Sequence, residues 1–210
     1  RTLCNVGAEC LHSNFSKMLH LPFGWKVPQD RGREDKMKRL IVFLGNPGKE
    51  YENTRHNAGF LLCNELFPAL SWQSKFHSMY SETSEYRILK PLTYMNLSGT
   101  AVSECTSFFK IKCDDILIVH DDLELPLGKA KMQKGGGLQG HNGLRNIKER
   151  VGNDGFWRLR IGIGRPKNND VRLYVTTPFT KDEAITLSHV FDKINEKRQF
   201  FYEEWEFSIG

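Results

Sequence analysis

A chain of 210 residues with 39% hydrophobic and 26% charged residues is long enough to bury a core and fits a single domain. These fractions exclude a disordered or fibrous chain, and no apolar run reaches the ~20 residues that a membrane-spanning helix needs. The five cysteines are scattered without a Cys-x-x-Cys pair, which indicates neither a zinc site nor a disulfide framework. A reducing compartment is therefore the simplest inference.

The first 37 residues differ from the rest of the chain. They contain scattered glycine, proline and asparagine, a run of mixed charge at 30–36 and little hydrophobic periodicity. An organelle transit peptide would be poor in acidic residues, and the four acids in this segment count against one. We predict an N-terminal extension of unknown function over 1–37 and a folded domain over 38–210.

From residue 39 on, strand-like and helix-like patterns alternate. The apolar run at 40–44 stops at Gly45-Asn46-Pro47-Gly48, as expected of a buried strand that enters a tight loop. In chain order the pattern predicts a strand at 40–44, a helix at 57–70, a strand at 86–90, a helix at 96–110, strands at 116–119 and 129–134, a helix at 140–151, a strand at 157–163 and a helix at 181–202. In the last strand, Arg158 and Arg160 alternate with apolar residues and predict one basic face. Strands separated by helices predict an α/β fold: a single domain with a twisted mixed sheet flanked by helices on both faces.

Positive charge is concentrated in one part of the chain. Between Lys129 and Arg172, eleven basic residues stand against three acidic ones, although the net charge of the whole chain is only +5. Such a stretch can bind a phosphate backbone and release counterions, so that its affinity falls with salt. An ordinary solvated face explains the same pattern, and charge alone leaves both interpretations open.

His56 is the strongest candidate for a catalytic base. It stands at the start of a predicted helix, where the positive end of the helix dipole disfavours a second positive charge and helps to keep the imidazole neutral. A carboxylate that orients the ring and stabilises the imidazolium would complete the site, and Asp121, at the end of a buried strand, is the best-placed one. Taken alone, a histidine near a helix start is more often a surface or capping residue.

Three asparagines, Asn46, Asn96 and Asn142, stand in loops or at the edges of predicted elements. An asparagine amide can donate to a carbonyl oxygen that gains negative charge and accept from a backbone N–H. Three converging amides would suit a site that holds a peptide main chain. Each one alone is more commonly a turn or helix-cap residue.

Metal ions and nucleotide cofactors are disfavoured. Asp121, Asp122 and Glu124 offer oxygen ligands for Mg²⁺ or Ca²⁺, but adjacent side chains on an extended backbone point to opposite sides. The glycine-rich segment at 135–143 lacks the Gly-Lys-Ser/Thr ending of a Walker loop and does not follow the first strand. Because no Gly-x-Ser-x-Gly elbow occurs, direct attack by water is favoured over a covalent intermediate. We expect neither a metal ion nor a cofactor.

Taken together, these segments resemble the bacterial-type peptidyl-tRNA hydrolases over about residues 39–195. The segments that carry the resemblance occur in the family's order: Gly45-Asn46-Pro47-Gly48, Tyr51, Thr54-Arg55-His56-Asn57, Lys90-Pro91, Met95-Asn96, His120-Asp121, Gly140-His141-Asn142-Gly143 and Arg158-Leu159-Arg160-Ile161-Gly162-Ile163-Gly164. Each segment alone is a weak signal, whereas their combination and order are specific.

The resemblance implies hydrolysis of the ester bond between a peptide and the 3′-terminal ribose of tRNA, with peptidyl-tRNA as the partner. It implies that His56 activates the water and that Asp121 orients His56. Asn46 and Asn96 would position the substrate carbonyl or peptide, and Asn142 would clamp the peptide main chain.

The resemblance also implies how the substrate is held outside the catalytic pair. Tyr51 and Tyr94 would line the cleft near the scissile ester. Four basic residues would face tRNA phosphates: Lys131, Lys134, Arg160 and Lys167. We expect a monomer in the cytoplasm, with mitochondria as the alternative location.

Two departures from the family's pattern leave alternatives open. The glycine-rich loop has Leu138 and Gln139 where relatives usually carry a histidine and a small residue, and the chain is shorter than many relatives near Lys167. Plants use non-hydrolytic members of this family as organelle splicing factors, and a similar binding module is the alternative function. Its docking surface would be the aromatic residues near the C-terminus: Phe200, Phe201, Tyr202, Trp205 and Phe207. A general RNA-binding protein is a third alternative.

Overall fold

Each helix and strand predicted from hydrophobic spacing is present close to its expected position. The computed structural model describes residues 38–201 and 208–209, so the predicted extension over 1–37 and the aromatic residues Tyr202, Trp205 and Phe207 lie outside the described residues. The strands are β1 (Arg39–Phe43), β2 (Gln73–Lys75), β3 (Ser78–Glu82), β4 (Tyr86–Pro91), β5 (Ile116–Asp122), β6 (Ala130–Lys134), β7 (Trp157–Gly162) and β8 (Ser208–Ile209). The α-helices are α1 (Ala58–Leu66), α2 (Ser98–Phe109), α3 (Asn142–Val151), α4 (Val171–Thr176) and α5 (Lys181–Glu196). Short 3-10 helices cover Lys49–Tyr51, Arg55–Asn57, Met95–Leu97, Cys113–Asp115 and Arg198–Phe201.

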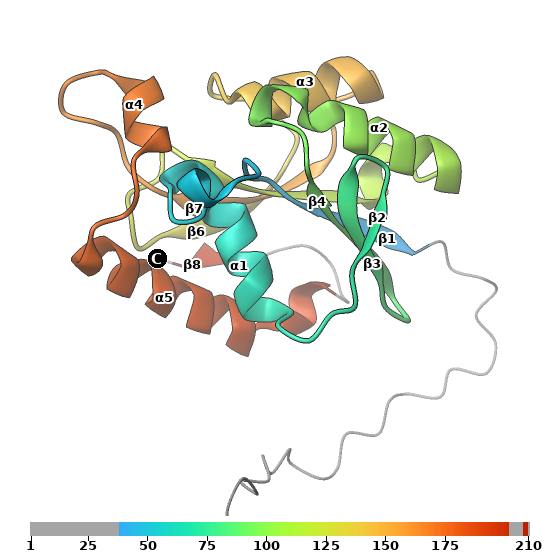
Figure 1. Ribbon diagram of the computed structural model, residues 1–210, viewed down its shortest axis with the longest axis horizontal. Coiled ribbons are helices and arrows are strands. Elements are labelled where there is room, and N and C mark those ends of the chain that lie inside the picture. The colour runs from blue at the N-terminus through green and yellow to red at the C-terminus, as the bar shows by residue number, and fades with distance from the viewer. Residues whose placement is uncertain (1–37, 202–207, 210) are drawn as a thin grey trace, which may run out of the picture. The chain divides into compact units, whose positions relative to one another are not determined.

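One mixed sheet joins these strands in the order β2-β3-β4-β1-β5-β7-β6-β8 (Figure 1). The central strands β4, β1, β5 and β7 are parallel, and antiparallel strands flank them on both sides. Parallel strands end at the same edge of a sheet, which is where α/β folds place their ligands. The segment after β1, with Asn46, and the last residues of β5, Asp121 and Asp122, therefore lie at one edge.

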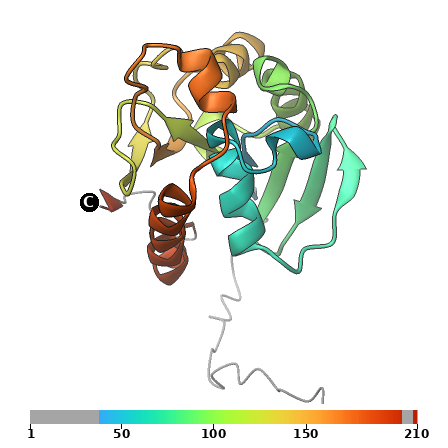
Figure 2. The same cartoon turned by 60° about the vertical axis from the view of Figure 1, so that its left-hand side comes forward.

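Helices cover both faces of the sheet, so each face has its own core (Figures 1 and 2). Residues of α1 and α5, including Leu62 and Ile194, pack in one core, and residues of α2 and α3, including Val102 and Ile147, pack in the other. Successive residues of β1 contribute to opposite cores, as the alternation of side chains along a strand requires. The predicted fold, a mixed sheet flanked by helices on both faces, is confirmed.

Helix α1 approaches the sheet closely at Gly59. A Cβ atom at this position would lie 2.5 Å from the carbonyl oxygen of Leu44 and 2.7 Å from that of Val119. Only glycine lets the helix start lie this close to the ends of β1 and β5. The approach brings His56, in the 3-10 helix directly before α1, beside the end of β5.

Among the strands and α-helices, four were not predicted from the sequence: β2, β3, α4 and β8. The β2–β3 hairpin turns through Phe76 and His77, both at positive φ, a conformation for which a two-residue turn commonly uses glycine or asparagine. Because neither turn residue is a glycine or an asparagine, the sequence did not predict the hairpin. Helix α5 ends at Glu196, before the predicted end at 202, and a 3-10 helix follows it.

Arg158 and Arg160 lie on one face of β7, opposite Leu159 and Ile161, as predicted, but this basic face is covered by other parts of the protein. Arg158 is 1% exposed, and its guanidinium donates to the backbone carbonyls of Gly135 and Gly137 in the glycine-rich loop. The side chain of Arg160 is 12% exposed and is likewise engaged within the protein. The glycine-rich loop folds back over this face, and sequence alternation alone could not reveal such a long-range contact.

The expectations for the cysteines and for a membrane-spanning helix can be compared with the structure. Cys63 and Cys105 are buried and Cys113 is half-buried, and all three are free thiols. Cys4 and Cys10 lie outside the described residues. Among the helices of the described ranges, none is long and apolar enough to cross a membrane.

Candidate active site

The predicted catalytic and substrate-binding residues all line one cleft of about 800 Å³ at the carboxyl edge of the sheet. These residues are His56, Asp121, Asn46, Tyr51, Tyr94, Asn96 and Asn142. They come from the loop after β1, the 3-10 helices before α1 and α2, the end of β5 and the start of α3. Segments that lie far apart in the sequence thus meet at the edge where parallel strands end.

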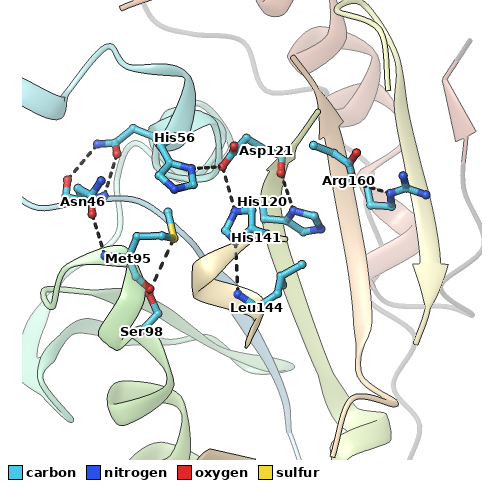
Figure 3. A network of polar contacts seen from close by, with 11 residues as sticks. Asn46, His56, Met95, Ser98, His120, Asp121, His141, Leu144 and Arg160 are labelled. Atoms are coloured by element: carbon cyan, nitrogen blue, oxygen red, sulfur yellow. Dashed lines mark hydrogen bonds and ion pairs between the residues drawn. The ribbon is translucent and has the colours of Figure 1, made fainter. Parts of the chain in front are cut away.

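His56 and Asp121 form a buried hydrogen-bonded pair (Figure 3). His56 Nδ1 lies 2.9 Å from Asp121 Oδ1, and the two residues are 9% and 2% exposed. A carboxylate can only accept, so Nδ1 carries the proton and Nε2 is left as the acceptor. This is the tautomer that a general base needs when its substrate approaches Nε2.

His141 shares the same carboxylate oxygen and was not singled out from the sequence. Its Nε2 lies 3.2 Å from Asp121 Oδ1, and its Nδ1 accepts from the backbone N–H of Leu144 as the N-cap of α3. Because Nδ1 accepts, the proton sits on Nε2 and is donated to Asp121. A role was predicted for the neighbouring Asn142, but no sequence pattern distinguishes a histidine that caps a helix from one that also contacts a distant carboxylate.

The pKa values of His56 and Asp121 are set by burial and by the attraction between the two side chains. Burial lowers the pKa of His56, but the charge of Asp121 and the hydrogen bond to it outweigh burial, so the pKa lies above its ordinary value. Burial raises the pKa of Asp121, but the charges and hydrogen bonds of His56 and His141 hold it well below its ordinary range. The net shift is thus opposite to the effect expected from the helix start alone, because the adjacent carboxylate is the strongest influence that raises the pKa.

His120 is a second buried imidazole at the floor of the cleft. Its Nδ1 donates to the backbone carbonyl of Asp121 over 2.7 Å, and its Nε2 has no hydrogen-bond partner among the described residues. Burial, with the nearby His141, lowers the pKa of His120 to about 3, so the ring is neutral at ordinary pH. Because the ring of His120 is neutral, the carboxylate of Asp121 interacts with the side chains of His56 and His141.

Asn46 is held in one orientation by backbone partners. Its Oδ1 accepts from the N–H of Met95 over 2.7 Å, while its own backbone exchanges two hydrogen bonds with the side chain of Asn57. With Oδ1 occupied, the Nδ2 group has no partner among the described residues and is the donor that Asn46 offers to the cleft. Asn57, which the sequence did not single out, is thus the residue that fixes the loop after β1.

The outer part of the cleft is more exposed. Asn96 and Asn142 are exposed, and the rings of Tyr51 and Tyr94 meet edge to face with centroids 6.4 Å apart. Gln139 of the altered glycine-rich loop lines the same region at φ 51°, an uncommon conformation for a residue other than glycine. This rim offers amides and aromatic edges rather than charges.

Helix α4, which the sequence did not predict, forms another wall of the cleft. It contributes Val171, Arg172, Val175 and Thr176, and Arg165 from the preceding loop lines the cleft beside them. The guanidinium of Arg165 pairs with Glu124. Both arginines belong to the basic stretch noted in the sequence, and Arg172 is brought to the cleft by α4.

The basic residues predicted to face tRNA lie outside the lining of the cleft. Lys131, Lys134 and Lys167 are exposed, and Lys134 forms an ion pair of 3.1 Å with Asp114. Arg160 instead donates to Asp122 over 2.7 Å and to Gln133 over 2.6 Å. Three of the four are therefore exposed to solvent, with Lys134 ion-paired to Asp114, and the fourth is tied into the sheet.

Groups that could hold a metal ion within the described ranges include His56, Asp121 and His141, whose ligand atoms lie within 4.8 Å of one another. Both histidines already donate to Asp121, and His141 needs its Nε2 proton because its Nδ1 accepts from the backbone. The carboxylate of Asp122 points to Arg160 and to the N–H of Glu124, away from that of Asp121. The donor set is therefore organised for proton transfer rather than for ligation.

Fold and site together define a class of protein: an α/β enzyme in which a histidine–aspartate pair faces an amide-rich cleft, without a nucleophile elbow or a nucleotide-binding loop. The family profile described as peptidyl-tRNA hydrolase matches residues 40–208. The chain is 49% identical over 152 residues to the peptidyl-tRNA hydrolase of Treponema pallidum, covering 67% of this chain and 75% of that protein. It is 45% identical over 161 residues to the peptidyl-tRNA hydrolase of Geobacter sulfurreducens, covering 73% and 83%.

A solved structure is similar over most of its length. The crystal structure of peptidyl-tRNA hydrolase from Acinetobacter baumannii superposes with a TM-score of 0.73 at 37% identity, covering 81% of this chain and 91% of that one. The chain belongs to the peptidyl-tRNA hydrolase family.

Proposed function

We propose that the protein hydrolyses the ester between a peptide and the 3′-terminal ribose of tRNA, with His56 as general base and Asp121 as the residue that orients it. The observation that carries the proposal is the 2.9 Å contact from His56 Nδ1 to Asp121 Oδ1, which leaves Nε2 as the acceptor on a cleft-lining residue. Nε2 takes a proton from water as the water attacks the ester carbonyl. The carboxylate stabilises the imidazolium that forms, and the proton then passes to the leaving ribose oxygen.

Asn46 is proposed to stabilise the oxygen that becomes negative during this attack. Its Oδ1 is occupied by Met95, so a substrate oxygen meets the Nδ2 donor without any reorganisation of the side chain. Asn96 and Asn142 are proposed to bind the peptide main chain, because an amide group can both donate to and accept from a peptide bond. Tyr51 and Tyr94 would enclose the region near the ester.

The tRNA body is proposed to lie against the basic residues of the β6–β7 side. Lys131, Lys134 and Lys167 are exposed and can neutralise phosphates. Arg160 can offer a phosphate only those N–H groups that Asp122 and Gln133 do not use. We further propose that the protein is a monomer, that it works in the cytoplasm, and that residues 38–210 form its catalytic domain.

The binding-module alternative is not favoured, since the relatives reported above are named as hydrolases and the expected catalytic residues are all present. The test is release of peptide from purified peptidyl-tRNA by the wild type and by His56→Ala. We expect the wild type to release peptide and the variant to be slower by about 10²–10⁴-fold, as for loss of a general base.

The matched control is His189→Ala, because His189 is exposed on α5 and lies outside the cleft lining. It should release peptide at the wild-type rate. A wild type that binds peptidyl-tRNA without releasing peptide would support the binding module instead. A fully active His56→Ala would contradict the assignment of the base.

A further inference from the structure

Arg55, the residue directly before the proposed base, has a buried side chain with an unusual number of partners. It is 5% exposed, and Nη1 donates to the backbone carbonyls of Tyr174, Thr177 and Pro178 over 3.4, 3.1 and 3.1 Å. Its Nη2 donates to Glu183 Oε2 over 2.6 Å. A buried guanidinium is costly unless it is paired and hydrogen-bonded, so this arrangement demands a specific set of acceptors.

The acceptors belong to the end of α4 and the start of α5. Helix α4 has six residues, too few for it to be stable without support from other parts of the protein. The carbonyl of Tyr174 already accepts from the N–H of Thr177 just after the helix, and the guanidinium of Arg55 adds donors and positive charge at this end, where the helix dipole favours them. The ring of Tyr174 lies 4.3 Å and that of Phe179 5.5 Å from Arg55 Cζ, so aromatic faces enclose the cation.

The backbones of the same two segments are also joined. Thr54 forms a β-bridge with Pro178, the N–H of Arg55 donates to the carbonyl of Thr177, and the N–H of Phe179 donates to the carbonyl of Asn53. One segment continues directly into His56, and the other continues back into α4. The proposed base and α4 therefore share one support.

The face of α4 that lines the cleft is fixed by this support and by one further contact. Tyr174 Oη donates to the carbonyl of Ile163 after β7 over 2.6 Å, which ties α4 to the sheet. Val171, Arg172, Val175 and Thr176 then form the wall of the cleft on this side. If the guanidinium is lost, the backbone carbonyls of Tyr174, Thr177 and Pro178 lose its donors, while the hydrogen bond between His56 and Asp121 is not directly affected.

The geometry points to Arg55 as a positioning residue that sets the distance between the α4 wall and the proposed base, and so the fit of the substrate in the cleft. This inference rests on the proposed function. It assigns Arg55 no contact with the reacting atoms. The expected consequence of its loss is weaker binding of peptidyl-tRNA, with the chemical step preserved once the substrate is bound.

The test compares KM and kcat for peptidyl-tRNA in the wild type, Arg55→Lys and Arg55→Met. A lysine keeps the positive charge, but its single ammonium group cannot donate to several carbonyls as the planar guanidinium does, and a methionine provides neither charge nor donors. Both variants should therefore raise KM by about tenfold or more, while kcat stays within about threefold of the wild-type value. The pH midpoint of kcat should be unchanged because Asp121 still holds His56. Arg198→Met, at an exposed arginine, is the matched control and should leave both constants unchanged.

A merely structural role gives a different result. Partial unfolding lowers the active fraction, so kcat would fall while KM stayed at the wild-type value. If Arg55→Met does not fold, Arg55→Lys and Glu183→Gln carry the test, and hydrogen exchange of the amides at 174–179 should be faster in both. A wild-type KM in these variants, with His56→Ala inactive, would overturn the role of Arg55 and leave the proposed function standing.

Discussion

The catalytic pair and the basic strands use charge in opposite ways. Asp121 is 2% exposed and accepts from two histidines, so its charge acts at fixed distances where water screens it little. Lys131 on β6 is exposed and has no ion pair among the described residues, so its charge acts through solvent and is weakened by salt. A change in the pair should therefore slow the chemical step, and a change on the strands should weaken binding.

The comparison predicts its largest effect for Asp121→Asn. An asparagine does not stabilise the imidazolium as a carboxylate does, so peptide release in a single turnover should slow by about 10²–10⁴-fold. Binding of tRNA should be nearly unchanged because no phosphate contact is removed. The matched control is Asp182→Asn, at an exposed position on α5. A single-turnover rate close to that of the wild type would refute the role of Asp121.

Asn46→Asp should have the next largest effect and tests whether Nδ2 acts as a donor. The new carboxylate keeps an acceptor for the N–H of Met95 but replaces the Nδ2 donor with an oxygen. The single-turnover rate should fall by about 10²–10³-fold, the range for the loss of one donor to a developing oxyanion. Asn195→Asp, at an exposed position, adds the same charge elsewhere and should be silent. Equal rates for the two variants would remove Asn46 from the chemistry.

The smallest effect on peptide release is expected for a substitution at Lys131, an exposed residue of β6. Lys131→Glu should weaken tRNA binding, reduce the slope of log K against log salt by about 1 and leave the single-turnover rate unchanged. Lys110→Glu, at an exposed lysine after α2, is the control. Arg160 is a less suitable site for this test, because its removal also leaves the buried Asp122 without its ion-pair partner. Identical salt slopes for Lys131→Glu and the wild type would place Lys131 outside the tRNA footprint.

The sequence predicted the meeting of His56 and Asp121 for a physical reason. Asp121 stands where a buried strand ends, and His56 stands at the start of the helix that follows the first strand and its loop; parallel strands bring such ends and loops to one edge of the sheet. The α4 wall and the clamp at Arg55 could not be predicted in this way. Helix α4 is short and depends on Arg55 and on Tyr174, and neither partnership leaves a periodic pattern in the sequence.

His141 and Arg158 show the same limit. Each is fixed by a contact to a loop or carboxylate that is distant along the chain. Hydrophobic spacing reports which face of an element is buried, but it does not report which backbone carbonyl a buried cation will reach. For this reason the strand at 157–163 and its basic face were predicted, whereas the burial of that face was not.

The central claim is that Asp121 controls the protonation of His56, and titration of the His56 ring nitrogens by NMR tests it most directly. In the wild type the pKa of His56 should lie above its ordinary value of 6.5, so kcat/KM should rise with pH through that midpoint as the ring becomes neutral. In Asp121→Asn the attraction is lost while burial still disfavours the charged ring, so the midpoint should fall below 6.5. The same midpoint in both proteins would contradict the account.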